Sequence, residues 1–276
     1  DKKIILFRDD ALYEIIQHYT LESGVRELER QMISILRKIA VTIAQGRRIV
    51  RLVVTKSKVN KLLGARKYVE TNIKTKPTIG YALGLVWTEM GGDVLPVEVV
   101  PMRGKARLTL TGSLGEVMQE SATAGLSYVR NHASAFGLPE DFYEKLELHV
   151  HIPEGAVPKD GPSAGVTLLT AMVSSLTGIP VKTSIAMTGE ITLTGDVLPV
   201  GGLNEKLLAA KRLGVNHIIV PARNRKDISE LKKELLKGLK LSYVRSVREV
   251  LKLAMEESPF KGRERRLALP TTAQPQ

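Results

Sequence analysis

The sequence predicts an α+β protein in which a small helical domain precedes a larger domain of mixed helices and strands. Apolar residues recur at helical spacing up to about residue 70, whereas after Pro77 short strands alternate with helices. The net charge changes at the same place, from +9 over residues 1–77 to +3 over residues 78–276. We therefore expect a helical domain at 1–72, a linker at 73–80, a mixed domain at 81–260 and a flexible tail at 261–276.

The helical domain is expected to hold two amphipathic helices, then one short strand and a third helix. The first helix has Asp9 as its N-cap, and the second follows Gly24. The strand is "RIVRLVVT", and the third helix runs from near Thr55 to Gly64. The apolar faces of the first two helices are Leu12, Ile15, Ile16 and Tyr19, and Val25, Leu28, Met32, Ile35, Leu36 and Ile39.

The mixed domain opens with strands and continues with helices that alternate with further strands. "VLPVEVVPM" and "ARLTLTG" read as strands, and Ser113 with Glu116 predicts a capping box for the helix that follows. "LELHVHI" is another strand, and "SAGVTLLTAMVSSLT" predicts a buried helix that ends at Gly178. "AMTGEITLTGDVLPV" predicts paired strands. The last third predicts parallel βαβ units, with helices at 204–213 and 227–237, strands "HIIVPA" and "LSYVRS", and a last helix capped by Ser246 and Glu249.

Composition excludes several classes of protein. The chain has no cysteine, which excludes a disulfide framework and a thiolate nucleophile and agrees with a cytoplasmic location. No apolar stretch is long enough to span a bilayer, so we expect no membrane partner. The first residue is Asp rather than Met, so we expect a piece of a longer protein. The basic N-terminal segment favours binding of DNA or of an acidic partner; a solvated basic face, or a face that docks on an acidic neighbouring subunit, is the alternative.

Ser163 in "KDGPSAG" is a candidate nucleophile. Pro162 and the apolar run after it place a helix start at the serine, where free N–H groups and the positive end of the helix dipole would stabilise an oxyanion. Asp160 is expected to cap this helix. A serine between glycines is by itself a weak signal, and on this motif alone a small residue at a helix start is the favoured explanation.

A serine nucleophile needs a base, and two places in the sequence offer one. His149 and His151 lie two apart and so share one face of a strand, where they suit a Ser/His pair, a metal site or a structural role. With no third ligand at metal spacing, we expect no metal. Lys206 falls in the first turn of a helix beside leucines, and both the dipole and burial lower a lysine pKa. Thr188 could hold its amine, and Glu98 is either a buried carboxylate aimed at the histidines or a solvent-facing residue.

The stretches around these residues resemble the proteolytic domain of the Lon family of ATP-dependent serine proteases. The resemblance rests on "HVHIPEGA", "PKDGPSAG", "MTGEITLTGDVLPVGGLNEKLLAAKR" and "TGSLGEVMQES", and covers most of residues 78–258. It implies a serine endopeptidase with a Ser/Lys dyad, in which Ser163 is the nucleophile and Lys206 the general base. It further implies that Thr188, His149, His151 and Glu98 are supporting neighbours, and that Asp160 is a flanking residue able to occupy or gate the site.

The N-terminal part is similar to the all-helical lid of the AAA+ ATPase half of the same family. "ESGVRELERQ" matches the segment that carries the sensor-2 arginine, which implies that Arg26 contacts nucleotide phosphates. An exposed Arg26 paired with Glu22 or Glu29 is the alternative. No G-x-x-x-x-G-K-[ST] motif occurs, so we expect ATP and magnesium to serve the full-length protein and not to bind these residues alone. The family also implies homohexamers that degrade unfolded, damaged or regulatory proteins in the bacterial cytoplasm or the mitochondrial matrix.

Overall fold

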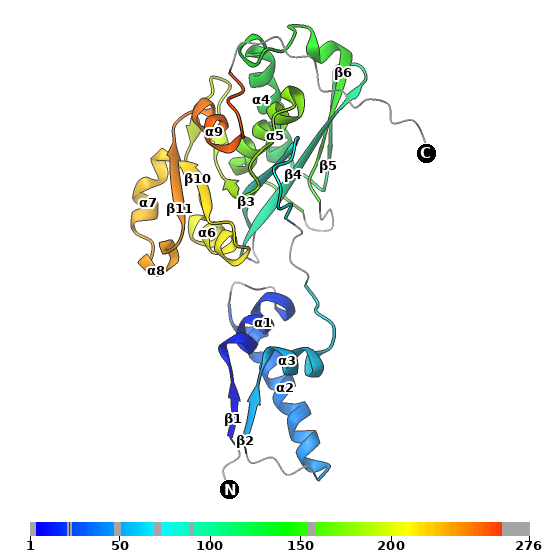
Figure 1. Cartoon of the computed structure of the whole chain (residues 1–276), viewed down its shortest axis with the longest axis vertical. Coiled ribbons are helices and arrows are strands. Elements are labelled where there is room, and N and C mark those ends of the chain that lie inside the picture. The colour runs from blue at the N-terminus through cyan, green and yellow to red at the C-terminus, as the bar shows by residue number, and fades with distance from the viewer. Residues whose placement is uncertain are drawn as a thin grey trace. The chain divides into compact units, whose positions relative to one another are not determined.

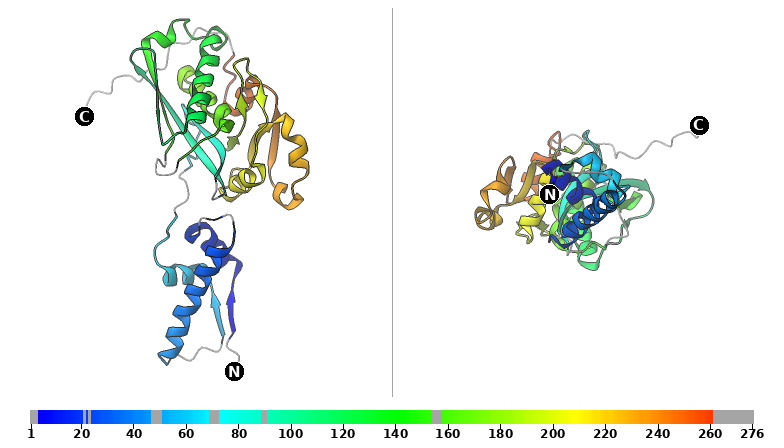
Figure 2. Two further views of the ribbon diagram at one scale, coloured as in Figure 1. Left: turned by 180° about the vertical axis from the view of Figure 1, so that it is seen from behind. Right: turned by 90° about the horizontal axis from the view of Figure 1, so that it is seen from below.

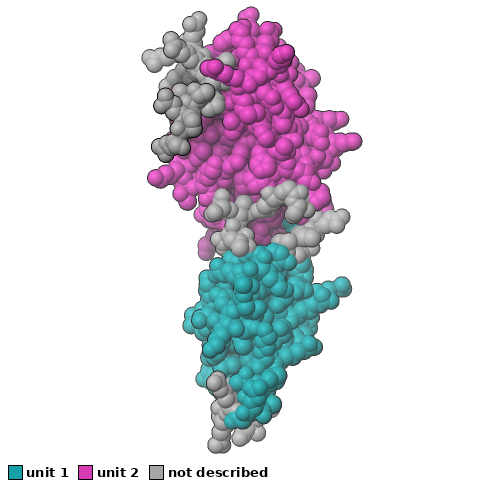
Figure 3. Space-filling model, turned by 90° about the vertical axis from the view of Figure 1, so that its right-hand side faces the viewer, with its two compact units in different colours: residues 1–72, 89–91 teal, residues 73–88, 92–276 magenta. Residues whose placement is uncertain are grey.

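A computed structural model describes residues 4–20, 22, 24–46, 51–68, 73–88, 91–153 and 158–260. The chain divides into two compact units, residues 1–72 with 89–91, and residues 73–88 with 92–276 (Figure 3). Residues 73–80, the expected linker, all belong to the second unit, where Thr78 pairs with Val181. The expected tail, 261–276, lies outside the described residues.

The first unit combines helices with a two-stranded parallel sheet (Figure 1). The strand expected in "RIVRLVVT" is present as β2, but the lid is not all helical, because β2 "RLVV" pairs along its whole length with an unexpected strand, β1 "IILF". Asp9 is the first helical residue rather than the N-cap, which is Arg8. The elements are β1 (Ile4–Phe7), α1 (Asp9–Tyr19), α2 (Arg26–Ala44), β2 (Arg51–Val54) and α3 (Lys56–Leu63).

A separate hydrophobic core holds the first unit together. Each of its helices and β2 contribute to it, with Ile15, Ile35 and Val59 fully buried or nearly so. Glu22 caps α2, because its carboxylate accepts a hydrogen bond of 2.9 Å from the amide of Leu28. The unit is therefore built to fold around its own core.

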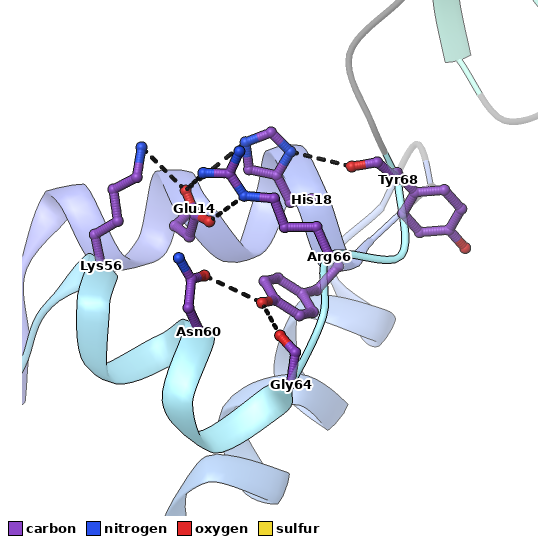
Figure 4. A network of polar contacts seen from close by, with 8 residues as sticks. Glu14, His18, Lys56, Asn60, Gly64, Arg66 and Tyr68 are labelled. Carbon is purple, nitrogen blue, oxygen red and sulfur yellow. Dashed lines mark hydrogen bonds and ion pairs between the residues drawn. The ribbon is translucent and has the colours of Figure 1, made fainter.

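The carboxylate of Glu14, on α1, is buried at the centre of a cationic network (Figure 4). Arg66 donates two hydrogen bonds to it, at 2.8 and 3.0 Å, and the Lys56 amine lies 3.3 Å away. His18, one turn further along α1, lies 3.7 Å from Glu14 and bonds the carbonyl of Tyr68. The network thus fastens α3 and residues 66–68 to α1.

A seven-stranded sheet in the order β11-β10-β7-β3-β4-β6-β5 forms the frame of the second unit (Figure 1). The strands β3, β7, β10 and β11 run parallel to one another, so the βαβ pattern expected for the last third is confirmed. The β4–β6 pair is antiparallel, and β8–β9 form a separate antiparallel pair. The strands are β3 (Tyr81–Thr88), β4 (Gly91–Arg103), β5 (Arg107–Thr111), β6 (Leu146–His151), β7 (Ile185–Met187), β8 (Glu190–Ile191), β9 (Val197–Leu198), β10 (His217–Pro221) and β11 (Lys240–Val244).

Helices cover both faces of this sheet (Figures 1 and 2). Alternate residues of β3 pack into the different cores on the two faces. Ala82 and Val86 face the core that includes α4, α5 and α9, whereas Leu83 and Leu85 face the core beneath α6, α7 and α8. The α-helices are α4 (Glu116–Asn131), α5 (Gly165–Thr177), α6 (Leu203–Arg212), α7 (Arg225–Ser229), α8 (Lys233–Leu236) and α9 (Val247–Ala254). Short 3-10 turns, η1 (Ser134–Phe136), η2 (Phe142–Lys145), η3 (Pro162–Ala164) and η4 (Ala222–Asn224), complete the unit.

Three local expectations in the second unit are corrected. Ser113 does not cap α4, because its backbone is left-handed at φ 58° and the N-cap position falls on Gly115. The helix expected at 227–237 is broken into α7 and α8. The strand β3 was not expected, because its residues are buried on both faces and show no alternation of apolar and polar residues. The cap of α9 is confirmed, since Ser246 Oγ accepts from the amide of Glu249 at 3.4 Å.

Candidate functional site

Ser163 lies in the 3-10 turn η3, immediately before α5, rather than in the first turn of the α-helix. The cause is visible in its carbonyl, which accepts hydrogen bonds from the amide of Gly189 at 2.9 Å and from the hydroxyl of Thr188 at 3.3 Å. The carbonyl is therefore held by the β7–β8 connection. Two amides at this helix start are also bonded within the chain, because the Gly165 amide bonds the Pro162 carbonyl and the Val166 amide bonds the Gly189 carbonyl.

Lys206 lies in the first turn of α6, as expected, and its side chain is buried. The helix begins after Gly202, whose left-handed conformation, φ 67°, turns the chain into α6. Burial lowers the pKa of the Lys206 amine from its ordinary value of 10.5 to about 8. The neutral form of the amine, the form that accepts a proton, is therefore populated near physiological pH.

Thr188 joins the lysine to the serine. The Lys206 amine donates a hydrogen bond of 3.1 Å to the Thr188 hydroxyl, which in turn bonds the Ser163 carbonyl. Within the described residues, no hydrogen bond runs directly from the Ser163 hydroxyl to the Lys206 amine. Thr188 is fully buried and follows β7 at the carboxyl end of that strand, where α/β sheets place their ligand sites. The chain thus brings together the Ser163 backbone, a buried threonine and a partly neutral amine.

Two family models match the chain in the order of its two structural units. The description "Lon protease (S16) C-terminal proteolytic domain" matches residues 53–257, about three quarters of the chain. The chain belongs to the Lon protease family. The description "Lon protease AAA+ ATPase lid domain" matches residues 1–53. The structure divides the Lon chain later than the two models do, after residue 72, because α3 packs into the core of the first unit.

Several curated Lon proteases are about half identical to this chain. The Lon protease of Solibacter usitatus is 49% identical over 274 residues, that of Nitratidesulfovibrio vulgaris 50% over 259, and that of Dictyoglomus thermophilum 49% over 265. These alignments cover 96%, 92% and 96% of this chain, but only 34%, 32% and 34% of the relatives. The chain therefore spans about one third of the length of the Lon proteases that it matches.

His149 and His151 share one face of β6, as expected, and both bond the Thr111 hydroxyl, at 2.9 and 2.8 Å. Glu98 lies directly across from His151 in the β4–β6 register but pairs with Lys74 at 3.1 Å. The Glu98 side chain is 37% exposed, so it is not the buried carboxylate of the first alternative. No hydrogen bond among the described residues joins these three side chains to Ser163, Thr188 or Lys206.

Asp160 precedes the nucleophile turn in the chain, but its side chain caps the start of α4 and not the start of α5. Its Oδ1 accepts hydrogen bonds from the amides of Met118, at 3.0 Å, and of Gly161, at 2.8 Å. The expectation that Asp160 caps the helix after Ser163 is therefore wrong, because Gly161 and Ala164 are the N-caps there.

Arg26 is the first residue of α2 in the lid and is exposed. In the described part of the chain it forms no ion pair with Glu22 or Glu29, and Glu22 is instead the cap of α2. The same part of the chain has no helix long and apolar enough to cross a membrane. It also contains no group of three or more His, Cys, Asp or Glu residues that could hold a metal ion.

Two glycines that the sequence analysis did not single out shape the site. Gly189 binds the Ser163 carbonyl through its amide and the Val166 amide through its carbonyl, so it locks η3 to β8. Gly92, on β4, packs against the first turn of α6, where an added Cβ would lie 2.0 Å from the Glu205 carbonyl oxygen. Both contacts join segments far apart in the sequence, and only the double glycines in "EMGGDV" and the "TGE" turn hinted at them.

Proposed function

We propose that this Lon-family chain is a serine endopeptidase in which Ser163 is the nucleophile and Lys206 the general base. One observation carries the proposal. The Lys206 amine is buried, its pKa is lowered to about 8, and it is hydrogen-bonded to the threonine that holds the Ser163 backbone. Burial of this amine costs folding free energy, but its lowered pKa suits it to accept a proton during catalysis.

In the proposed reaction, the neutral Lys206 amine accepts the proton of the Ser163 hydroxyl as the serine oxygen attacks a peptide carbonyl. The ammonium that results then protonates the leaving amine, which leaves an acyl-enzyme. Water, deprotonated by the same amine, hydrolyses the ester and releases Ser163. Thr188 keeps the amine directed towards the nucleophile turn, and the positive end of α5 favours the developing oxyanion.

We propose unfolded or damaged proteins as substrates and a homohexamer as the assembled form of the longer protein, on the strength of the family alone. The exposed Arg26 at the start of α2 suits contact with the phosphates of ATP, while the sequence contains no G-x-x-x-x-G-K-[ST] motif to hold the rest of the nucleotide. We do not propose DNA as a partner, because only the net charge of residues 1–77 favours it.

The test is cleavage of a fluorogenic peptide and of unfolded casein by the chain and by two variants. Ser163→Ala should remove measurable cleavage, and Lys206→Gln should lower kcat by at least about a thousandfold, since nucleophile and base act as one unit. Glu29→Gln, an exposed change in the lid, serves as control and should cleave at the unchanged rate. Cleavage that persists in Ser163→Ala would show that another group is the nucleophile.

A further inference from the structure

The segment that leads into the nucleophile turn is fastened to the start of α4 by one carboxylate oxygen. Asp160 Oδ1 accepts the amide of Met118, the third residue of α4, which has no partner within its own helix. The same oxygen accepts the amide of Gly161. Asp160 therefore supplies the side-chain cap of α4, whose own N-cap position, Gly115, lies some forty residues earlier in the chain.

Gly115 provides the space that this carboxylate occupies. A Cβ added at Gly115 would lie 2.3 Å from Asp160 Cγ and 2.5 Å from its Oδ2, closer than atoms approach without bonding. The backbones on either side are also paired, because the Gly115 amide bonds the Lys159 carbonyl at 2.8 Å and the Lys159 amide bonds the Ser113 carbonyl at 3.0 Å. Asp160 and its neighbours are thus seated against residues 113–115 by both backbone and side chain.

The same helix also reaches the nucleophile turn itself. Ser121, one turn after Met118, has its hydroxyl 3.5 Å from the carbonyl of Pro162, the residue before Ser163. Between the two contacts lies Gly161, whose φ of 121° reverses the chain into the 3-10 turn. The N-terminal side of the turn is therefore held to α4 by two contacts, and Ser163 itself is held to the β7–β8 connection through Gly189.

We propose that Asp160 is a positioning residue for the peptidase: it holds the Ser163 turn in place by capping α4, with Gly115 as its seat. This inference rests on the function proposed above. It differs from a gating role beside the lysine, in which the charge of Asp160 would matter. In the described residues Asp160 bonds the amides of Met118 and Gly161, the Lys206 amine bonds Thr188, and no ion pair joins Asp160 to Lys206. Burial alone lowers the pKa of Lys206, with no contribution from a carboxylate.

The two mechanisms predict opposite behaviour of two variants at Asp160. Asp160→Asn keeps the oxygen that accepts both hydrogen bonds and removes only the charge, and asparagine is as good an N-cap as aspartate. Under the proposal it should cleave peptides within about twofold of the unchanged rate. Asp160→Ala removes the oxygen and should lower kcat at least about tenfold with little change in KM, because the nucleophile is misplaced while substrate binding remains.

Gly115→Ala tests the packing of Asp160 against Gly115 while leaving the Asp160 carboxylate in the chain. The φ of Gly115 is −68°, which alanine adopts without strain, so its effect should come from displacing Asp160. It should lower kcat to the level of Asp160→Ala, and the double variant should be no worse than either single one. Gly24→Ala is the matched control, because the added Cβ would meet nothing closer than 4.0 Å. Ser246→Ala removes the cap of α9 and controls for a general loss of helix stability.

Hydrogen exchange gives a readout that does not depend on catalysis. Amides in residues 116–120 should exchange faster in Asp160→Ala and in Gly115→Ala, but not in Asp160→Asn or Ser163→Ala. If Asp160→Asn matches Asp160→Ala in rate or exceeds the unchanged protein, or if exchange is the same in all variants, the positioning role is wrong. If residues 116–120 exchange faster only in Asp160→Ala and Gly115→Ala, but Ser163→Ala still cleaves peptides, Asp160 does cap α4 and the assignment of Ser163 as nucleophile is wrong.

Discussion

The buried amine of Lys206 links the pH dependence of the proposed reaction to the stability of the fold. Both effects follow from one displaced pKa, about 8 in the folded chain against 10.5 for an ordinary lysine. Sequence reasoning reached this residue because helix start, leucines and lysine are adjacent in "GGLNEKLL". It could not reach Gly92, Gly115 or Gly189, because their contacts are made with segments far away in the sequence.

The first prediction is that kcat/KM for peptide cleavage rises with pH and levels off above about pH 8–9. Below the pKa of about 8, the neutral fraction of Lys206 grows roughly tenfold per pH unit, so activity should follow it. Rates measured from pH 6 to 10 with a fluorogenic peptide check this. A flat profile across that range would mean that Lys206 is not the base.

The second prediction is that Lys206→Met stabilises the proteolytic unit while removing its activity. At pH 7 both folded and unfolded states hold the proton, and the folded state bears the cost of a buried ammonium, about 3 kcal/mol for this pKa difference. The cost fades as pH rises from 8 towards 10.5, because only the unfolded chain still binds the proton there. Urea unfolding at pH 7 and at pH 10 should show a larger gain at pH 7.

At the scale of whole elements, the sequence predicted helices and parallel βαβ units well where periodicity was strong. It missed β1 and β3, because short apolar runs such as "IILF" and "YALGLVWT" show neither alternation nor helical spacing. The capping box at Ser113 was wrong for another reason. The cap of α4 comes from Asp160, and a tertiary cap leaves no pattern in the residues next to the helix.

The third prediction concerns the packing of β4 against α6. Gly92→Ala would place a Cβ 2.0 Å from the Glu205 carbonyl oxygen and 2.8 Å from the Lys206 amide, so the first turn of α6 must move. We expect a loss of about 1–3 kcal/mol in unfolding free energy and a fall in kcat, because Lys206 moves with the helix. Gly201→Ala, just before the same helix, meets nothing within 4 Å and should leave both quantities unchanged.

At the scale of the whole molecule, the chain holds two units with separate hydrophobic cores. The change in composition near Pro77 pointed to two parts, but the extent of each depended on packing that the sequence does not display. α3, for example, follows the segment matched by the lid model yet buries Val59 in the lid core. Separate cores imply that the two units unfold in separate steps.

The fourth prediction is that Glu14→Gln destabilises the lid and spares the proteolytic unit. The change leaves Arg66, Lys56 and His18 around an uncharged amide and should lower the unfolding free energy of the lid by about 3 kcal/mol. Differential scanning calorimetry should show one transition lowered and one unmoved, with Glu29→Gln as the exposed control. A single transition, or a shift of both, would contradict the independence of the two cores.

Acid should act on the same network. Burial alone would raise the pKa of Glu14, but the hydrogen bonds from Arg66 and Lys56 outweigh it and leave the pKa below its ordinary value of 4.5. The stabilisation that Glu14 provides is therefore present at neutral pH and is lost as pH falls below about 4.5 through the lowered pKa. The lid transition should therefore move to lower temperature over that range.

The amide of Thr188 is bonded to the carbonyl of Ile219, so the strand that carries the threonine is completed by a strand made later in the chain. During biosynthesis, the serine and the threonine leave the ribosome before the segment that steadies them. In a growing polypeptide the proposed site is therefore incomplete until β10 has been translated and has docked.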